Sequence, residues 1–212
     1  MGPLRVHPAN PRYFSDGSGK AVYLTGSHTW ANLQERGCEG ITPNFDYLAY
    51  LAFLQNFQHN FMRLWTWEHA MWMQFTDKNI RYTPLPFVRS GPGTALDGAL
   101  KFDLSRFHPP YFDRLHARVS AARDRGIYVA VMLFQGFSIE QKGTLGVDPN
   151  KGNPWDGHPF HRHNNINGID GDPNGSGEGK AVHTLAIPAI TALQKAYVCH
   201  VVNTLNDLDN VL

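Results

Sequence analysis

Carboxylates are the side chains of this chain that could do chemistry on a neutral, hydroxylated substrate. Among its glutamates, Glu68 directly follows an aromatic segment, Trp65-Thr66-Trp67. Hydrolysis of a glycosidic bond with retained configuration needs two carboxyl groups about 5–5.5 Å apart, one as nucleophile and one as acid/base. Glu68 is a candidate for one of these roles, and the alternative is a loop carboxylate that orients Arg63 or a substrate hydroxyl.

Four tryptophans gather after the first two segments that are expected to be strands: Trp30, Trp65, Trp67 and Trp72. Indole rings offer flat apolar surfaces on which the C–H face of a sugar can stack, while the sugar hydroxyls need polar partners such as His69. We therefore expect a substrate-binding surface made of these residues: His28, Trp30, Trp65, Trp67, Glu68 and Gln135. The alternative is that at least half of the tryptophans lie in the core.

A later segment carries three imidazoles, His158, His161 and His163, in a His-x₂-His-x-His pattern. Three imidazoles can hold a zinc ion, although no fourth ligand is evident in the sequence. A solvated histidine-rich loop is the alternative interpretation.

The residues after this cluster alternate oxygen-bearing side chains at every second position, beginning with Asp170, Asp172 and Asn174. This spacing is similar to the first half of a calcium-binding loop. The bidentate glutamate expected at the twelfth position is missing, because Ala181 or His183 stands there. A polar loop closed by turn residues is the alternative, and we expect no cofactor.

Arg63 lies within the apolar segment Asn60–Trp67, which is typical of a buried strand. A guanidinium is costly to bury without a partner, so the sequence predicts a carboxylate or carbonyl beside it. Arg63 would then either support a catalytic carboxylate or form a structural ion pair.

Helices must position these residues, and three are expected. Thr42 and Pro43 are typical of the start of a helix, and its apolar face would consist of Phe45, Leu48, Ala49, Ala52 and Phe53. The second covers Tyr111–Arg125 and ends at Gly126, where a left-handed cap is expected. The third covers Ile187–Leu208. The apolar stripe of the second helix contains Phe112, Leu115, Val119 and Ala122. That of the third contains Ile190, Leu193, Tyr197, Val201 and Leu208.

The expected strands begin with a hairpin of Arg12–Phe14 and Ala21–Thr25 and continue with Asn60–Trp67, Ile127–Phe134 and the start of a fourth at Val211-Leu212. Residues 68–108 and 135–183 are expected to be long, irregular loops. Strands that alternate with helices predict an α/β fold with a parallel sheet. Both loops follow the carboxyl ends of strands, where βα-barrels carry their chemistry.

Three segments form an ordered pattern: Asn10–Gly17, Tyr23–Trp30 and Asn60–Trp65. In this order they resemble the cellulase-like glycoside hydrolases of clan A, and within the clan the family-5-like and apiosidase-like bacterial proteins. Trp155–Phe160 and Asn164–Asp172 are similar to a loop of the same subgroup. The resemblance covers essentially the whole chain and implies a TIM barrel in which Arg63 supports the catalytic carboxylate.

The same resemblance implies that the catalytic pair is absent. In that clan the acid/base glutamate follows the fourth strand and the nucleophile ends the seventh. Val211-Leu212 looks like the beginning of the fourth strand, so only about four βα units are present. We therefore expect a partial (β/α)8 TIM barrel, a (βα)4 half barrel at residues 21–212, preceded by a hairpin strand and turn at residues 1–20.

The charge balance narrows the possible partners. Nineteen Lys and Arg against 18 Asp and Glu give a formal net charge of +1, which argues against a nucleic-acid or polybasic membrane surface. No apolar run approaches the about 18 residues of a membrane span. The chain shows no signal peptide, so the cytoplasm is the default location, and Cys38 and Cys199 are expected to be free thiols.

The sequence therefore predicts a glycoside-hydrolase-like module for plant or microbial polysaccharide that lacks hydrolase activity by itself. The alternatives are a non-catalytic carbohydrate-binding or self-assembling module, and a glycosidase completed by oligomerisation. A half barrel would leave two sheet edges unpaired and an inner face exposed at Met62, Leu64, Val129 and Val131. These surfaces predict a homo-oligomer, with a two-fold dimer as the most frequent solution.

Overall fold

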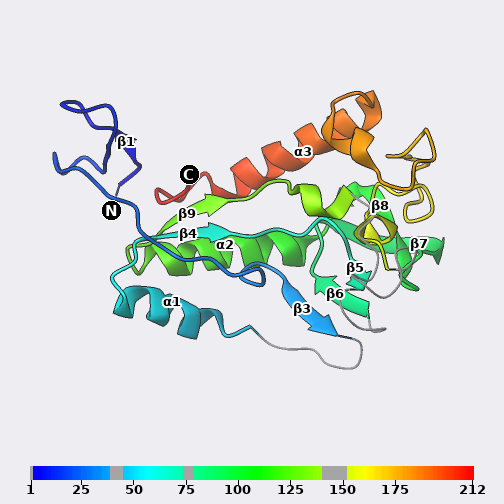
Figure 1. The fold of residues 1–212 in the computed structure, drawn as a ribbon, viewed down its shortest axis with the longest axis horizontal. Helices are drawn as coiled ribbons and strands as arrows, with labels where there is room; N and C mark the ends of the chain where they lie inside the picture. Colours follow the sequence, from blue (N-terminus) through cyan, green and yellow to red (C-terminus); the bar gives the residue numbers. More distant parts are fainter. Residues whose placement is uncertain (1, 39–44, 74–78, 140–151) are drawn as a thin grey trace.

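The computed structural model describes residues 2–38, 45–73, 79–139 and 152–212. At its centre β4 (Phe61–Leu64) pairs in parallel with β9 (Tyr128–Val131). Gly26 forms a parallel bridge to Phe61 on one side of this pair, and Val211 forms a parallel bridge to Val129 on the other. Four parallel segments thus lie side by side in the order of the sequence, which confirms the expected mixed α/β pattern (Figure 1).

Three amide side chains hold the chain before α1 against β4 and the residues that follow it up to Trp67. We call them the amide ladder, and each both donates to a backbone carbonyl and accepts a backbone N–H at 2.6–3.0 Å. Asn60 donates to the carbonyl of Tyr23 and accepts the N–H of Thr25. Asn32 donates to the carbonyl of Arg63 and accepts the N–H of Trp65. Gln34 donates to the carbonyl of Trp67 and accepts the N–H of the same residue. These bonds hold the two segments together on both sides of Gly26. At Gly26 itself the backbones approach so closely that a Cβ would lie 1.7 Å from the Phe61 oxygen.

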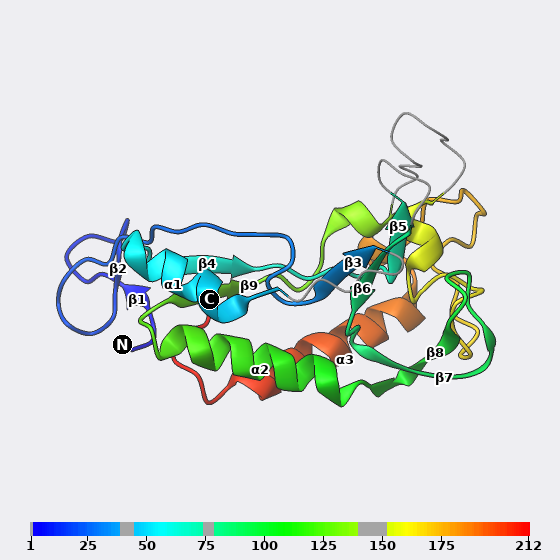
Figure 2. The same ribbon diagram turned by 90° about the horizontal axis from the view of Figure 1, so that it is seen from below.

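The second and third helices follow the expected pattern. α2 (Pro109–Arg123) buries its predicted stripe, and Gly126 has a φ of 72°, as expected for a left-handed cap. α3 (Pro188–Leu205) buries Ile190, Tyr197 and Val201. Both pack against the face of the sheet that carries Met62, Leu64 and Val129, and Figure 2 shows them on one side of β4 and β9.

The first helix, α1 (Tyr47–Asn56), begins after Asp46, whose carboxylate accepts the backbone N–H of Ala49. Thr42 and Pro43, the expected start, lie outside the described residues. The predicted apolar face is wrong, because α1 buries Tyr47, Leu51 and Leu54 while two members of that face, Leu48 and Phe53, are exposed. Nearly every position of this helix is apolar, so its sequence does not specify one face.

The described parts of the segment 68–108, residues 68–73 and 79–108, contain strands, which corrects the expectation of an irregular loop. β3 (Glu35–Cys38), β6 (Asn79–Thr83) and β5 (Met71–Met73) form an antiparallel sheet in that order. β7 (Phe87–Thr94) and β8 (Leu100–Phe107) form an antiparallel hairpin. The glycines that suggested a loop belong to an irregularity in β7, where Gly91 and Gly93 have positive φ and the register shifts.

The N-terminal hairpin is smaller than predicted. β1 (Arg5–Val6) pairs antiparallel with β2 (Phe14–Ser15), and the expected pairing with the next strand is reduced to one bridge between Phe14 and Val22. The hairpin lies at the amino end of β9, whereas the small antiparallel sheets gather at the carboxyl ends of β4 and β9 (Figure 1).

The second long loop contains short 3₁₀ helices: η1 (Gly136–Ile139), η2 (Pro154–Gly157) and η3 (Lys180–His183). Trp155 is buried in a second apolar cluster together with residues of β7 and β8. Gly171 and Gly179 lie against its indole ring, where a Cβ would come within 2.6 and 2.3 Å of ring atoms. Among the helices of the described ranges, none is both long and apolar enough to cross a bilayer.

Candidate functional site

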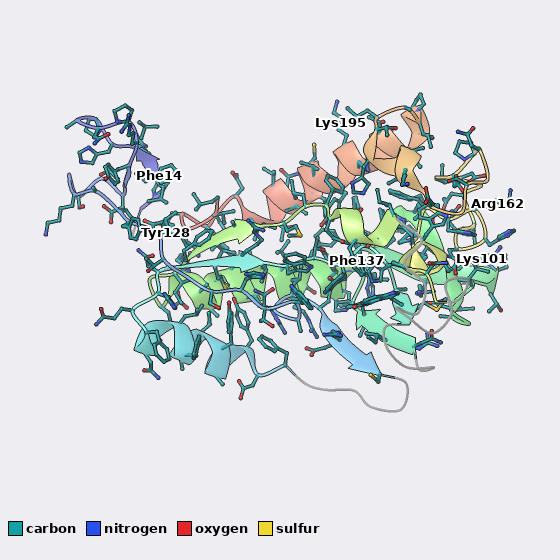
Figure 3. All side chains as sticks on the ribbon, in the orientation of Figure 1. Phe14, Lys101, Tyr128, Phe137, Arg162 and Lys195 are labelled. Carbon is teal, nitrogen blue, oxygen red and sulfur yellow. The ribbon has the colours of Figure 1, made fainter. Side chains whose placement is uncertain are left out.

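An aromatic cleft opens at the carboxyl ends of β4 and β9, with a volume of about 560 Å³. Figure 3 labels Phe137 in this region, with Phe14 and Tyr128 at the opposite end of the molecule. Its walls come from the segments that follow these strands and from β3, β5 and β6: Trp30, Arg36, Trp65, Trp67, Trp72, Tyr82, Met132, Phe134, Gln135, Gly136 and Phe137. Arg36 is the one charged side chain among these described residues, so the cleft is apolar and nearly neutral.

The sequence left two interpretations of the four tryptophans, a ligand-binding surface or burial in the core, and the structure divides them between the two. Trp67 and Trp72 are buried at 5% and 4% exposure and belong to the core. Trp30 is 50% exposed, and Trp65 is half-buried and stacks on His28 with ring centroids 5.6 Å apart. Two of the four tryptophans therefore remain available to contact a ligand.

Tyr82 and Phe137, which sequence reasoning missed, complete the aromatic wall. The Tyr82 ring lies 4.8 Å from the Trp67 ring, and the Phe137 ring meets the Trp72 ring edge-on at 4.6 Å. Tyr82 belongs to β6 inside the segment predicted to be irregular. The alternation of Ile80 and Tyr82 with polar neighbours was a signal of a half-buried strand that the sequence reasoning did not use. Phe137 lies three residues after the end of the predicted strand, and its proximity in sequence to Gln135 was the available signal.

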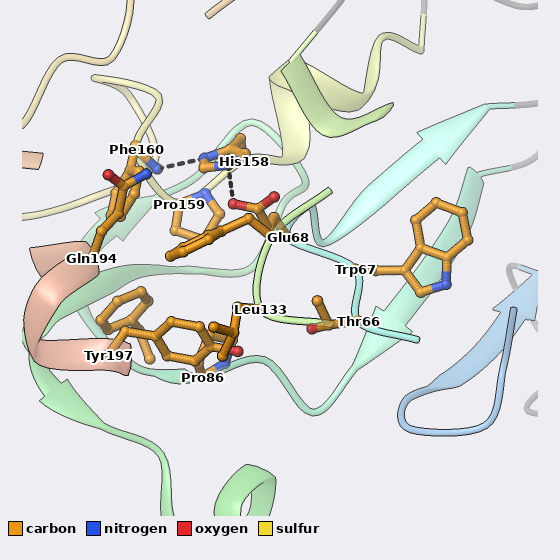
Figure 4. A pocket seen from close by; sticks show the side chains of 12 residues that line it. Thr66, Trp67, Glu68, Pro86, Leu133, His158, Pro159, Phe160, Gln194 and Tyr197 are labelled. Carbon is orange, nitrogen blue, oxygen red and sulfur yellow. Dashed lines mark hydrogen bonds and ion pairs between the residues drawn. The ribbon is translucent and has the colours of Figure 1, made fainter. Parts of the chain in front are cut away.

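Glu68 lies behind this cleft in a small cavity of about 30 Å³, shown in Figure 4, that shares Trp67 and Phe134 with the cleft. Its Oε2 accepts the backbone N–H of Gln135 at 2.8 Å. Nε2 of His158 lies 3.7 Å from Oε1, and Nε2 of His183 lies 3.5 Å from Oε2. The structure thus brings together Glu68, Gln135 and two histidines from the long second loop.

Glu68 is held as a carboxylate. Burial by itself would raise its pKa, but the interactions with His158 and then His183 outweigh burial and lower the pKa to about 2. The interaction with Glu68 in turn raises the pKa of His183. At neutral pH this arrangement contains a carboxylate and an imidazole that readily becomes cationic.

His158 is instead held neutral. Burial lowers its pKa in spite of the neighbouring Glu68. Its Nδ1 accepts the backbone N–H of Phe160 at 3.0 Å, so the ring proton lies on Nε2 and points toward Glu68. At 3.7 Å that contact is longer than a hydrogen bond.

The turn after β9 joins the two cavities. Gln135 accepts the backbone N–H of Phe137 at 2.8 Å through Oε1 and donates through Nε2 to the Ser138 hydroxyl. The same hydroxyl lies 2.5 Å from Nδ1 of the buried His69. His69 and Gln135, expected as partners of a ligand, therefore use polar atoms to hold η1 in place.

The structure does not assemble the metal sites considered from sequence. Among the described residues, no group of three or more His, Cys, Asp or Glu side chains is arranged to hold a metal ion. His158 points to Glu68, away from the adjacent rings of His161 and His163. The two loop aspartates act on their own backbone, because Asp170 accepts the N–H of Asp172 and Asp172 accepts those of Ser176 and Gly177.

The expected burial of Arg63 is wrong. Met62 and Leu64 are fully buried, whereas Arg63 between them is exposed. None of the described carboxylates forms an ion pair with it. The apolar run is therefore a strand with one buried face, and Arg63 belongs to the other. Cys38 and Cys199 are exposed free thiols, as expected.

Comparison with known proteins found no match to the chain among protein-family models, curated proteins or solved structures.

Proposed function

We propose that this chain is a glycoside-hydrolase-like half barrel whose aromatic cleft binds a saccharide. The observation that carries the proposal is the cleft itself: flat rings with little charge, at the carboxyl ends of parallel strands. Its volume falls within the ~300–1,000 Å³ of small-molecule pockets. Nε1 of Trp65 is buried without a hydrogen-bond partner in the described part of the chain, and a sugar hydroxyl would satisfy this donor if the rings that cover it moved on binding.

The proposed role is binding without hydrolysis by the isolated chain. The described residues that line the cleft include no carboxylate. Glu68 lies in the neighbouring cavity, and its pKa of about 2 leaves it without the proton that a general acid must deliver near neutral pH. Two carboxyl groups about 5–5.5 Å apart, which retaining hydrolysis requires, are therefore not provided by this site.

The half-barrel part of the proposal is supported by topology. Four parallel segments follow one another in chain order, and the helices cover one face of the sheet. Val129 is buried against those helices together with Met62 and Leu64, so these residues are not the exposed inner face that the sequence suggested. In a dimer, a second copy would cover the opposite face, which carries the exposed Arg63. Sedimentation at micromolar concentration measures whether the chain is a dimer.

Binding is tested with soluble oligosaccharides, cellopentaose and xylopentaose, by calorimetry and tryptophan fluorescence. We expect micromolar to millimolar affinity, and Trp30→Ala should weaken it by about 3- to 10-fold, the value of one aromatic contact. Tyr23→Ala is the matched control, because Tyr23 is 76% exposed but lies outside the cleft.

Two results would overturn this proposal. Equal affinity of wild type and Trp30→Ala would remove the cleft from the binding surface. Turnover of an aryl glycoside that Glu68→Gln abolishes would make Glu68 a catalytic residue and the chain a hydrolase in its own right.

A further inference from the structure

The geometry points to Glu68 as a positioning residue that holds the wall of the aromatic cleft, with His183 as the protonation-dependent group that holds Glu68. This inference deepens the proposed function and rests on it, because it concerns how the same cleft is regulated. It would make saccharide binding depend on pH although the cleft itself is nearly uncharged.

The first step is the link from Glu68 to the cleft. Oε2 of Glu68 accepts the N–H of Gln135, the first residue of the turn that forms one wall. The Gln135 side chain holds Phe137 and Ser138, and the Phe137 ring contacts those of Trp67 and Trp72. A displacement of Glu68 is thereby passed to the aromatic rings that a ligand would contact.

The second step is the link from Glu68 to the second loop. His183, at the end of η3, approaches the same Oε2 that accepts from Gln135. Its side chain is 24% exposed, so it can exchange a proton with solvent, whereas that of His158 is only 2% exposed. His183 is therefore the member of this group that can titrate without opening the core.

Three further titratable groups of the described residues interact with Glu68. His158 faces Glu68 from the second loop and affects both Glu68 and His183. The hydroxyls of Tyr111 in α2 and Tyr197 in α3 also face the carboxylate, and burial raises the pKa of both. Neither tyrosine changes charge between pH 5 and pH 9. Among these described groups, His183 is therefore the one whose pKa is raised above 6.5 and whose charge changes in the range above it.

The direction of the effect follows from these charges. Protonated His183 pairs with the buried carboxylate and fixes it, and this support is fully present below the ordinary histidine pKa of 6.5. The support is lost as the pH rises through the raised pKa of His183. Glu68 stays ionised over this range, because its own proton returns only near pH 2.

The test measures the dissociation constant of whichever oligosaccharide binds, cellopentaose or xylopentaose, between pH 5.5 and 9. We expect wild-type affinity to fall at least threefold across this range. His183→Gln should bind at every pH with the weaker affinity that the wild type shows at pH 9. Glu68→Gln should also lose the pH dependence. Trp30→Ala is the matched control: it should bind more weakly but keep the wild-type pH profile.

A ligand-free titration separates this inference from the proposed function. NMR of the wild type should show His183 titrating above 6.5, with the Gln135 amide resonance following the same curve, and Glu68→Gln should abolish both shifts. Saccharide binding that does not vary with pH, or a pH profile that survives His183→Gln, would overturn the inference and leave the cleft intact. Absence of saccharide binding would overturn the proposed function, and the Gln135 titration would then decide whether Glu68 and His183 are coupled.

Discussion

An amide side chain carries a donor and an acceptor in the same relative arrangement as a peptide group, and three amides use that property along β4 and the residues that follow it. Asn60, Asn32 and Gln34 satisfy backbone groups that strand pairing would otherwise satisfy. Asn32 and Gln34 are fully buried, so water cannot replace them. The segment that ends in Glu68 is therefore fixed by side chains rather than by a long strand.

Asn32→Ala should be strongly destabilising, because it leaves the carbonyl of Arg63 and the N–H of Trp65 buried without partners. The expected loss is about 2–5 kcal/mol from two unsatisfied groups, or a fall in Tm of roughly 5–15 °C for a chain of this size. Thermal unfolding followed by circular dichroism measures it. Asn203→Ala, at an exposed position of α3, is the control and should leave Tm nearly unchanged.

Arg63→Met should be nearly neutral for stability, because the guanidinium is exposed and pairs with none of the described carboxylates. We expect the free energy of unfolding to change by no more than about 0.5 kcal/mol. Chemical denaturation of both proteins provides the comparison. A loss of several kcal/mol would show that Arg63 has a buried partner after all.

Single residues also show where sequence reasoning reached its limit. Glu68 was found because it follows an aromatic segment, and its link to Gln135 joins two residues already chosen as candidates. His183 was considered only for its place in a calcium loop. Its contact with Glu68 was not foreseen, because the two residues are 115 positions apart in the chain. Contacts at such separation depend on how the long loops fold, which no local pattern specifies.

At the scale of elements, prediction succeeded where the apolar pattern had one solution. α2 has a clear apolar stripe and a glycine cap, and both were placed correctly. α1 is apolar on most sides, so the choice of the buried face came from the sheet and α2 rather than from the helix itself. β7 and β8 were missed because glycine and proline within β7 mark an irregular hairpin as well as they mark a loop. β5 and β6 were missed because both are short.

The loop around Trp155 gives a matched pair of glycine substitutions. Gly175 and Gly179 both have a φ of 65°, but a Cβ at Gly175 meets open space while one at Gly179 would lie 2.3 Å from the Trp155 ring. Gly175→Ala should lose about 1–2 kcal/mol from its left-handed backbone. Gly179→Ala should lose about 1–3 kcal/mol more from overpacking. Equal losses, measured by urea denaturation, would mean that the loop shifts away from Trp155 without cost.

The molecule as a whole should lose stability on mild acidification. Burial lowers the pKa of His158, and burial with the nearby His163 lowers that of His161 to about 4. Because the unfolded chain binds protons at these rings near pH 6.5 and the folded chain does not, stability falls as the pH drops below 6.5. His183 has the opposite sign, but its stabilising contribution is gained above pH 6.5 and is already fully present below it, so it does not offset this fall.

Urea midpoints between pH 7.5 and pH 4.5 measure this dependence, and His161→Gln should make it shallower. Glu68 contributes no slope there, since its stabilising contribution, present above 4.5, is lost only as the pH approaches about 2. An identical slope in wild type and His161→Gln would contradict the assignment.

The separation of the two ends of the sheet has a practical consequence. The N-terminal hairpin lies at the amino end of β9, and the aromatic cleft opens at the carboxyl ends of β4 and β9 (Figure 1). A chain coupled to a bead or sensor chip through this hairpin would hold the cleft toward the solution. Coupling through the exposed Cys38 thiol, at the end of β3 and on the cleft side of the molecule, would instead bring the solid support close to the ligand.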